Sequence, residues 1–367
     1  MDYVELSTSG STGQPIKIKQ YLPVYQLHYG ALELLDTQWS NRDLNHNLGF
    51  FRISEPPALE RLIGEPFSFL GFRGKVISKK LIGSHPQEIL ETMATHNVRY
   101  ASLNAMAIRV MAIEQIKKPV NSLKIEHFLS WADPVTEELR NLVQEAFGAR
   151  IVDRYSSNEF GFLAIQCPAE NHLHAPQINN FIEIVDEANQ VVPIGKQGRV
   201  LVTALNNFSQ PMIRYELGDV ASWGEGCKSG ITYPILQPGI VRQRDMHLDS
   251  EGKMRIPHPD GIAAIKSGLV SRYQIFRFST SLVLLASLTR KASDFEIEEI
   301  KDQLGKQFSL NLKTKFVELP ESLEAQLHPW KNKRVIEMAA PEPALLNAQT
   351  LIDLIPKIGQ GLRVSGT

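Results

Sequence analysis

A run of small residues near the start of the chain has the composition of a phosphate-binding loop. It reads STSGSTGQP, from Ser7 to Pro15. Backbone N–H groups and hydroxyls of small residues can surround phosphate oxygens, and glycines permit close approach. The run is not a Walker loop, because no Gly-Lys-Ser/Thr ending follows it. Composition alone leaves open the alternative of a flexible surface loop.

Two cysteines and two histidines form a second set of residues that could do chemistry. Cys167, His172 and His174 are close in sequence, and Cys227 follows much later. Histidines two apart on a strand project to one face, and a Cys₂His₂ set is acceptable to zinc. Two cysteines make no disulfide framework. We favour free thiols and unliganded histidines, with a structural zinc site as the alternative.

The order of residues in the first loop resembles the signature S/T-S/T-S-G-S/T-T-G-x-P of the adenylate-forming superfamily. Many members have lysine directly after that proline, and Ile16 stands there instead. This departure resembles the phenylacetate–CoA ligase branch, where the lysine is usually missing. The resemblance implies that this loop binds the ATP phosphates. Its residues are Ser7, Thr8, Ser9, Gly10, Ser11, Thr12 and Gly13.

Two segments in the middle of the chain resemble the superfamily's adenine and magnesium motifs. SWADP resembles the loop lining the adenine and acyl pocket, through Ala132, Asp133 and Pro134. DRYSSNE resembles Y-G-x-T/S-E, with Tyr155 packing beside adenine and Ser156 in the glycine position. Its Glu159 matches the catalytic glutamate that binds Mg²⁺, and a hard carboxylate oxygen suits that ion. Taken alone, Tyr155 is more often a core residue.

Three later segments complete the resemblance. PMIRYELGD resembles R-Y-x-T-G-D, whose aspartate, here Asp219, accepts hydrogen bonds from both ribose hydroxyls. VRQRD resembles the segment joining two domains, with Arg242 at ribose or phosphate and Arg244 at the hinge. WKNKRVI resembles the C-terminal segment with the catalytic lysine, which Lys331 matches, with Lys333 as the alternative, beside charge developing between carboxylate and α-phosphate. Each of these basic residues could instead be a solvated surface charge.

Alternating strand-like and helical segments are expected to carry these residues. Thr136 is typical of a helix N-cap, and apolar residues at helical spacing follow it as far as Gly148. Such alternation predicts an α/β fold of helix-flanked, partly parallel sheets. A later β-β-α-β pattern, with its helix over residues 294–308, predicts a small α+β domain.

These elements predict a division of the chain into a large and a small domain. We expect a large adenylation domain at 1–243 that binds ATP and the acid, then a small mobile domain at 244–345. A C-terminal helix or tail should follow at 346–367. Relatives carry a longer segment before the phosphate loop, so the chain is either a shortened member or incomplete.

Bulk composition narrows the function classes. The chain has 367 residues, 43% of them hydrophobic and 22% charged, as in ordinary globular proteins. Its net charge of −1 gives no global field to attract nucleic acid or an anionic membrane. The longest apolar runs fall short of the roughly 20 residues of a spanning helix. No secretory signal pattern is visible, so the expected localisation is the cytoplasm.

The resemblance implies a ligase that uses ATP and Mg²⁺ to activate a carboxylic acid as an acyl-adenylate. An aryl or arylacetic acid of secondary metabolism is the expected substrate, and Phe128 and Trp131 either line its pocket or pack in the core. The acceptor is CoA or the phosphopantetheine of a carrier protein, or else a downstream reductase or acyltransferase takes the adenylate. A homodimer is left open.

Two alternatives to a self-sufficient enzyme remain. The chain could be a nucleotide-binding subunit that no longer catalyses and acts as a regulator or scaffold in an acyl-transfer assembly. It could also be an adenylating subunit that needs a partner chain to complete its sheets, which predicts exposed apolar strand edges. Acid-dependent exchange of pyrophosphate into ATP separates these alternatives from the enzyme.

Overall fold

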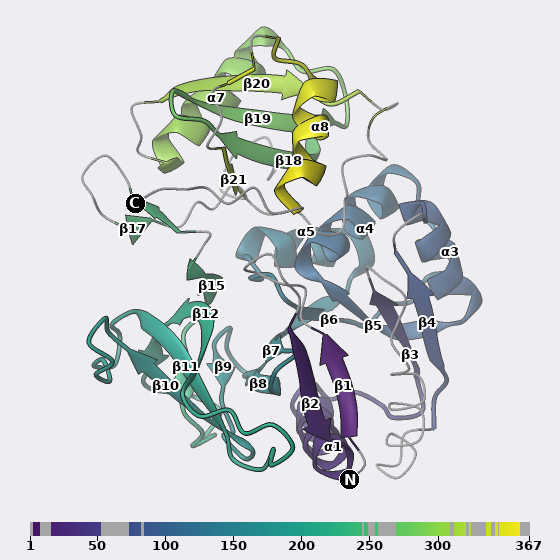
Figure 1. Ribbon diagram of the computed structural model, residues 1–367. Coiled ribbons are helices and arrows are strands. Elements are labelled where there is room, and N and C mark those ends of the chain that lie inside the picture. Colours follow the sequence, from purple (N-terminus) through teal and green to yellow (C-terminus); the bar gives the residue numbers. More distant parts are fainter. Residues whose placement is uncertain are drawn as a thin grey trace. The chain divides into compact units, whose positions relative to one another are not determined.

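The computed structural model consists of two compact units, Met1–Gln243 and Arg244–Thr367 (Figure 1). It describes residues 3–7, 16–52, 73–81, 84–243, 246–248, 254–255, 269–308, 312–320, 323, 335–338, 342–343 and 345–359. No helix in these ranges combines the length and the apolar character that crossing a membrane requires.

The described part of the first unit is organised by a nine-stranded mixed sheet. Its strands run in the order β13-β14-β9-β8-β7-β6-β5-β3-β4. The stretch from β4 to β7 is parallel, and the strands from β8 to β13 pair antiparallel. In chain order the elements of this unit are β1 (Tyr3–Ser7), β2 (Lys17–Tyr21), α1 (Leu22–Trp39), β3 (Asn47–Arg52), β4 (Val76–Lys80), α3 (Pro86–Thr95), β5 (Val98–Asn104), α4 (Ala105–Lys117), β6 (His127–Trp131), α5 (Glu137–Phe147), β7 (Arg150–Ser157), β8 (Gly161–Gln166), β9 (Leu173–His174), β10 (Asn180–Val185), β11 (Gly198–Ala204), β12 (Tyr215–Ala221), β13 (Trp223–Gly224), β14 (Ile235–Leu236) and β15 (Val241–Arg242). The predicted α/β class is confirmed.

Local sequence explains where α5 begins and ends. The Thr136 side chain accepts a hydrogen bond from the backbone N–H of Leu139 at 3.2 Å, which caps the first turn. Glu137 and Glu138 occupy that turn, where negative charge is favourable. Gly148 ends the helix in the left-handed conformation, with φ of 64°. The predicted helix is confirmed.

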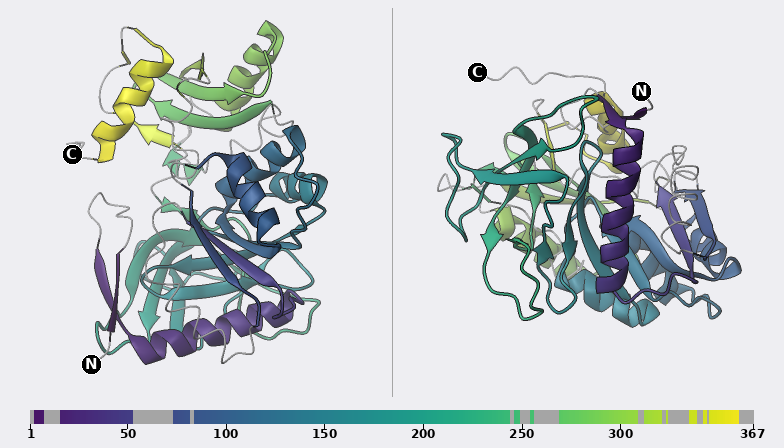
Figure 2. Two further views of the ribbon diagram at one scale, coloured as in Figure 1. Left: turned by 90° about the vertical axis from the view of Figure 1, so that its right-hand side faces the viewer. Right: turned by 90° about the horizontal axis from the view of Figure 1, so that it is seen from below.

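Helices cover both faces of the parallel strands. Tyr29 of α1 packs against a cluster on one face that includes Phe50, Tyr100 and Leu129. On the opposite face, Phe128 lies 5.0 Å from Phe147 of α5, measured between ring centroids. Figure 2 shows α1 lying along the sheet. Phe128 is therefore a core residue.

Buried charges fasten α1 to β7. Arg154 of β7 pairs with Glu33 at 2.9 Å and also with Asp36, and both acidic residues belong to α1. Arg42 pairs with the same two carboxylates at 2.8 and 2.7 Å. All four side chains are almost fully buried. Because an unpaired buried charge is strongly destabilising, this network holds β7 in a fixed position on the helix.

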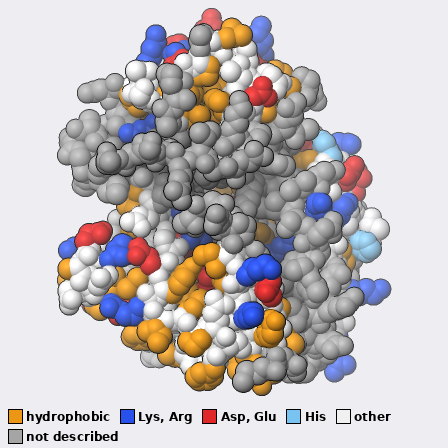
Figure 3. Space-filling view, in the orientation of Figure 1, with side chains coloured by type: hydrophobic (Ala, Val, Ile, Leu, Met, Phe, Trp, Pro, Cys, Tyr) orange, Lys and Arg blue, Asp and Glu red, His pale blue; other side chains and the backbone are white. Residues whose placement is uncertain are grey.

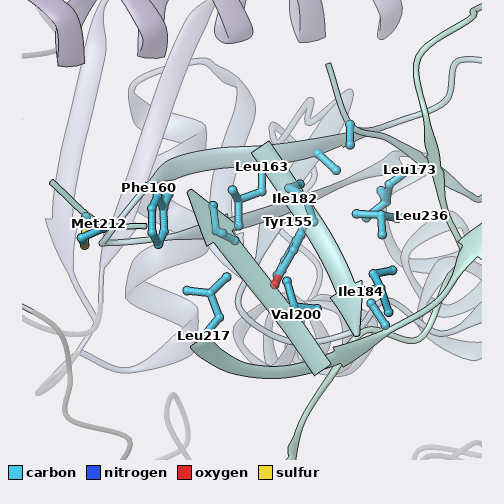
Figure 4. Close-up of a cluster of buried hydrophobic side chains, with 14 of the residues drawn as sticks. Tyr155, Phe160, Leu163, Leu173, Ile182, Ile184, Val200, Met212, Leu217 and Leu236 are labelled. Carbon is cyan, nitrogen blue, oxygen red and sulfur yellow. The ribbon is translucent and has the colours of Figure 1, made fainter. Parts of the chain in front are cut away.

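A second, antiparallel sheet in the same unit has the order β10-β11-β12-β15. Its apolar side chains pack against residues of β7 and β8 to form one core, shown in Figure 4. On the described part of the face shown in Figure 3, acidic and basic side chains are interspersed, in keeping with the net charge of −1.

The second unit contains the predicted β-β-α-β pattern. Its main sheet has the order β20-β19-β18-β21, and a buried apolar cluster joins that sheet to α8. The elements are β16 (His247–Leu248), β17 (Met254–Arg255), β18 (Val270–Arg277), β19 (Ser281–Leu288), α7 (Asp294–Phe308), β20 (Lys313–Glu318), β21 (Val335–Glu337) and α8 (Ala348–Gly359).

Candidate functional site

Tyr155 of β7 points into the core between the two sheets of the first unit (Figure 4). Only 9% of the residue is exposed. Its hydroxyl donates a hydrogen bond to Oδ2 of Asp219 at 2.8 Å. Burial, together with the negative charge of Asp219, raises the pKa of Tyr155 well above its ordinary value. The phenol therefore stays protonated and remains a donor to that carboxylate.

Asp219 owes its position to an irregularity in β12. The pairs Leu201–Glu216 and Arg199–Val220 show that β12 contains extra residues between these two points of its register with β11. Gly218 lies there with φ of 72°, a conformation that glycine adopts without strain. This bulge lies directly before Asp219 and re-aims the strand, which is what bulges near functional sites often do.

Arg242 reaches the same carboxylate from β15. Asp219 and Arg242 are direct partners in the register of the two strands. Nε of Arg242 lies 3.1 Å from Oδ1 of Asp219, and its Nη1 donates to the carbonyl of Leu217 at 2.8 Å. We call Tyr155, Asp219 and Arg242 the nucleotide cluster. Three segments far apart in sequence thus meet at one buried carboxylate.

Glu159 follows β7 in the turn that leads to β8 and is half-buried. Its backbone carbonyl accepts a hydrogen bond from the side chain of Gln20. Burial raises the pKa of Tyr215, and the charge of Glu159 adds to that rise and to the rise at Tyr155. The carboxylate therefore lies near the nucleotide cluster. A hard carboxylate oxygen at this position fits a magnesium ion.

The SWADP segment comprises the last two residues of β6 and a bend at Ala132 and Asp133, at the carboxyl edge of the parallel strands, where ligands commonly bind. Ala132 adopts φ of 73°, which is uncommon for a residue other than glycine. Asp133, Pro134 and Ser156 are half-buried. Their assignment to an adenine pocket stays a prediction.

Sequence reasoning missed Arg52, the last residue of β3. Its guanidinium lies 4.5 Å from the ring centroid of Trp131, a cation–π contact. No motif contains Arg52, and the only available signal was a basic residue directly after the apolar end of a strand. Trp131 is half-buried, and its Nε1 has no hydrogen-bond partner among the described residues.

Several predicted site residues cannot be placed. Only the backbone of Ser7 is described, as the last residue of β1. The others lie outside the described residues: Thr8, Ser9, Gly10, Ser11, Thr12, Gly13, Arg244 and Lys331. Their roles at phosphate, hinge and adenylate stay predictions.

The structure brings together the two cysteines and two histidines singled out in the sequence. One ligand atom from each of Cys167, His172, His174 and Cys227 lies within 4.8 Å of the others. We call these residues the Cys–His cluster. Both cysteines are free thiols in the structure, and the alternative of a structural zinc site stays a prediction.

Comparisons with known proteins place the fold. No protein-family model matches the chain. A stretch of 129 residues, 34% of the chain, is 29% identical to the phenylacetate–coenzyme A ligase of Thermus thermophilus. That stretch spans 29% of the Thermus enzyme's length.

Solved structures match far more of the chain. A 2-hydroxyisobutyryl-CoA ligase, in complex with an acyl-adenylate, superposes with a TM-score of 0.76 over 97% of this chain and 76% of its own, at 18% identity. An anthranilate CoA ligase bound to anthranoyl-AMP gives 0.61 over 87% and 64%, at 17% identity. The O-succinylbenzoate coenzyme A synthetase of Bacillus subtilis gives 0.57 over 86% and 66%, at 16% identity.

These matches agree with the motifs in Tyr155–Glu159, Arg214–Asp219 and Val241–Arg242. The chain has the fold of the adenylate-forming ligases and resembles their phenylacetate–CoA ligase branch, as its sequence predicted.

Proposed function

We propose that this chain activates a carboxylic acid with ATP, forming an acyl-adenylate and releasing pyrophosphate. The observation that carries the proposal is the nucleotide cluster, in which Tyr155 and Arg242 hold the buried Asp219 carboxylate from two sides. Each residue lies in a different motif of the adenylate-forming superfamily. A structural role alone would not require these motifs to converge on one carboxylate.

In this proposal Asp219 accepts hydrogen bonds from the ribose hydroxyls of ATP. A carboxylate presents two acceptor oxygens at a separation that suits a cis-diol. Arg242 supplies the opposite charge, and Tyr155 fixes the orientation of the carboxylate before ATP arrives. Such preorganised groups do not have to reorient when the nucleotide binds.

Tyr155 exposes little of its ring face, because only 9% of the residue is accessible. We therefore place adenine against the edge of this residue and the SWADP turn rather than flat on the Tyr155 ring. In this refinement of the sequence prediction, Tyr155 acts mainly through its hydroxyl.

Glu159 would hold the magnesium ion that accompanies ATP. The ion would neutralise charge on the phosphate oxygens. The acid's carboxylate oxygen attacks the α-phosphorus, the bond to the bridging oxygen breaks, and pyrophosphate leaves with the electron pair. The protein's contribution is to orient the two reactants and to stabilise developing charge. The loop Ser7–Gly13 and Lys331 are the residues we propose for the remaining phosphate contacts.

An aryl or arylacetic acid is the substrate class we propose. The carbons of the acid would lie beside Trp131, where the ring and the Arg52 guanidinium offer an apolar face and a positive charge. Support comes from the Thermus phenylacetate ligase and from the anthranoyl-AMP bound to one structural neighbour. CoA is the acceptor we propose, with a carrier's phosphopantetheine as the alternative.

Exchange of labelled pyrophosphate into ATP, screened over aromatic and aliphatic acids, tests the reaction. We expect exchange with at least one aromatic acid and its loss in Asp219→Ala. Asp302→Asn is the matched control, because Asp302 is an exposed residue of α7 whose pair with Lys306 contributes little. If folded protein binds ATP but shows no exchange with any acid, the chain is a non-catalytic or partner-dependent homologue.

A further inference from the structure

We propose that the Cys–His cluster binds one zinc ion, which fastens the chain between β12 and β15 to the edge of the nine-stranded sheet. The cluster is separate from the nucleotide cluster and does not depend on the proposed reaction. It joins two loops that are distant in sequence. Cys167, His172 and His174 come from β9 and the turn before it, and Cys227 comes from the loop between β13 and β14.

The distances between ligand atoms are those of a tetrahedral site. Zn–S bonds of about 2.3 Å and Zn–N bonds of about 2.0 Å imply S–S, N–N and S–N separations of about 3.8, 3.3 and 3.5 Å. Sγ of Cys167 lies 3.6 Å from Sγ of Cys227. The Nε2 atoms of His172 and His174 are 3.2 Å apart, and Nε2 of His174 is 3.3 Å from Sγ of Cys227. All remaining pairs lie within 4.8 Å, so small side-chain rotations complete the site.

The surrounding groups prepare the ligands for a cation. Nδ1 of His174 lies 3.0 Å from the carbonyl of Tyr233. If Nδ1 carries the proton, it donates to that carbonyl and leaves the lone pair of Nε2 facing the other ligands, as is usual for zinc-bound histidine. Backbone N–H groups two residues further on donate to both sulfurs, from Ala169 at 3.5 Å and Ser229 at 3.4 Å. Such bonds stabilise thiolates.

Burial supports a structural role for the ion. His174 is fully buried, and Cys167 and His172 are 3% and 9% exposed. Four protein ligands complete the coordination of zinc and leave no position for water or substrate, which is the pattern of structural sites. Two thiolates balance the charge of the ion. Polar groups buried as deeply as these three need partners, and zinc would serve them together with the half-buried Cys227.

The position of the cluster shows what the ion would hold. β14 pairs with β9 through Ile235 and His174, and the loop 225–234 closes the β13–β14 hairpin. Cys227 anchors that loop to the turn before β9. A metal ion that crosslinks the two loops lowers the conformational entropy that the loop 225–234 has when it is detached from the sheet. It would therefore stabilise the stretch between β12 and β15.

The experiment measures metal in the full-length purified protein by plasma mass spectrometry. We expect one zinc per chain that survives dialysis, and its loss in Cys227→Ser. His96→Gln is the matched control, because His96 is an exposed residue at the end of α3 and should leave the zinc content unchanged. Replacing zinc with Co²⁺ in the wild-type protein should give thiolate charge-transfer bands and the strong visible bands of a tetrahedral site. This measurement stays informative if Cys227→Ser does not fold.

Three outcomes would overturn the proposal. The first is wild-type protein that takes up only traces of metal after exposure to zinc. The second is a disulfide between Cys167 and Cys227, seen as a loss of both thiols that a reductant reverses and a chelator does not affect. The third is Co²⁺ binding with an octahedral spectrum and no thiolate bands, which would indicate adventitious surface binding.

Discussion

The stretch of chain from β12 to β15 contributes residues to both clusters: Asp219 and Arg242 to the nucleotide cluster, and Cys227 to the Cys–His cluster. Different forces hold the two clusters together. In the nucleotide cluster a carboxylate, a phenol and a guanidinium satisfy one another. In the Cys–His cluster the close groups are two sulfurs and two imidazole nitrogens, which repel one another once the thiols are deprotonated. The protein completes the first cluster with its own groups, whereas we propose that a zinc ion completes the second.

The difference implies that the nucleotide cluster serves ligand binding and the Cys–His cluster serves folding stability. Charge-assisted hydrogen bonds prepare Asp219 for a ligand that comes and goes. A closed zinc site would contribute to folding itself, because the four ligands meet only in the folded chain. Damage to the first cluster should impair nucleotide binding, and damage to the second should lower stability.

Removing the metal should produce the largest effect on stability. A site filled at about a thousand times its Kd stabilises by about 4 kcal/mol. For a unit of this size the thermal midpoint should fall by about 8–16 °C after chelation. Calorimetry of zinc-loaded, chelated and reloaded protein measures the change. An unchanged midpoint in protein shown to have lost its zinc would contradict a structural role.

Asp219→Asn should impair the nucleotide cluster and leave the Cys–His cluster intact. Hydrogen bonds to a charged group contribute about 1.5–3 kcal/mol each, so losing the charge should weaken ATP binding at least about 100-fold. Calorimetric titration with ATP measures this loss. Zinc content should stay at the wild-type value, and a parallel loss of zinc would show that the two clusters are not independent.

Tyr155→Phe should have a smaller effect in the same direction. It removes one donor to Asp219 and keeps the ring in the core, so ATP affinity should fall by about 1–2 kcal/mol. Tyr233→Phe is the control, since the Tyr233 side chain is exposed and does not belong to the nucleotide cluster. Equal losses in the two variants would argue against orientation of Asp219 by Tyr155.

His127 of β6 lies outside both clusters and is expected to affect how stability depends on pH. It stacks on Tyr100 with ring centroids 5.6 Å apart. Burial and the charge of Arg42 lower its pKa to about 4. The unfolded chain therefore binds a proton that the folded chain does not, and stability falls as the pH drops from about 6.5 towards 4.

His127→Gln should weaken that dependence, and this is the smallest effect we predict. Between pH 7 and pH 5 the variant should lose about 1 kcal/mol less than the wild type, allowing for partial exposure of the ring. Urea unfolding at the two pH values measures the difference. Identical curves for wild type and His127→Gln would show that other groups control the acid response.

The amino-acid order determined the fold class and most of the nucleotide cluster. Thr136 and Gly148 delimited a helix because caps are local interactions between residues close in sequence. Asp219 and Arg242 were recognisable because each lies in a motif whose neighbours follow in a fixed order. These signals need no knowledge of long-range contacts.

Only the tertiary structure decided how distant residues meet. The bulge at Gly218 and the pairing of β12 with β15 bring Arg242 to Asp219, and strand register cannot be read from a single motif. Cys227 joins His174 because β14 pairs with β9, two short strands that no hydrophobic pattern predicts. A ligand set assembled from two loops depends on that pairing, so the sequence alone could not favour the metal site.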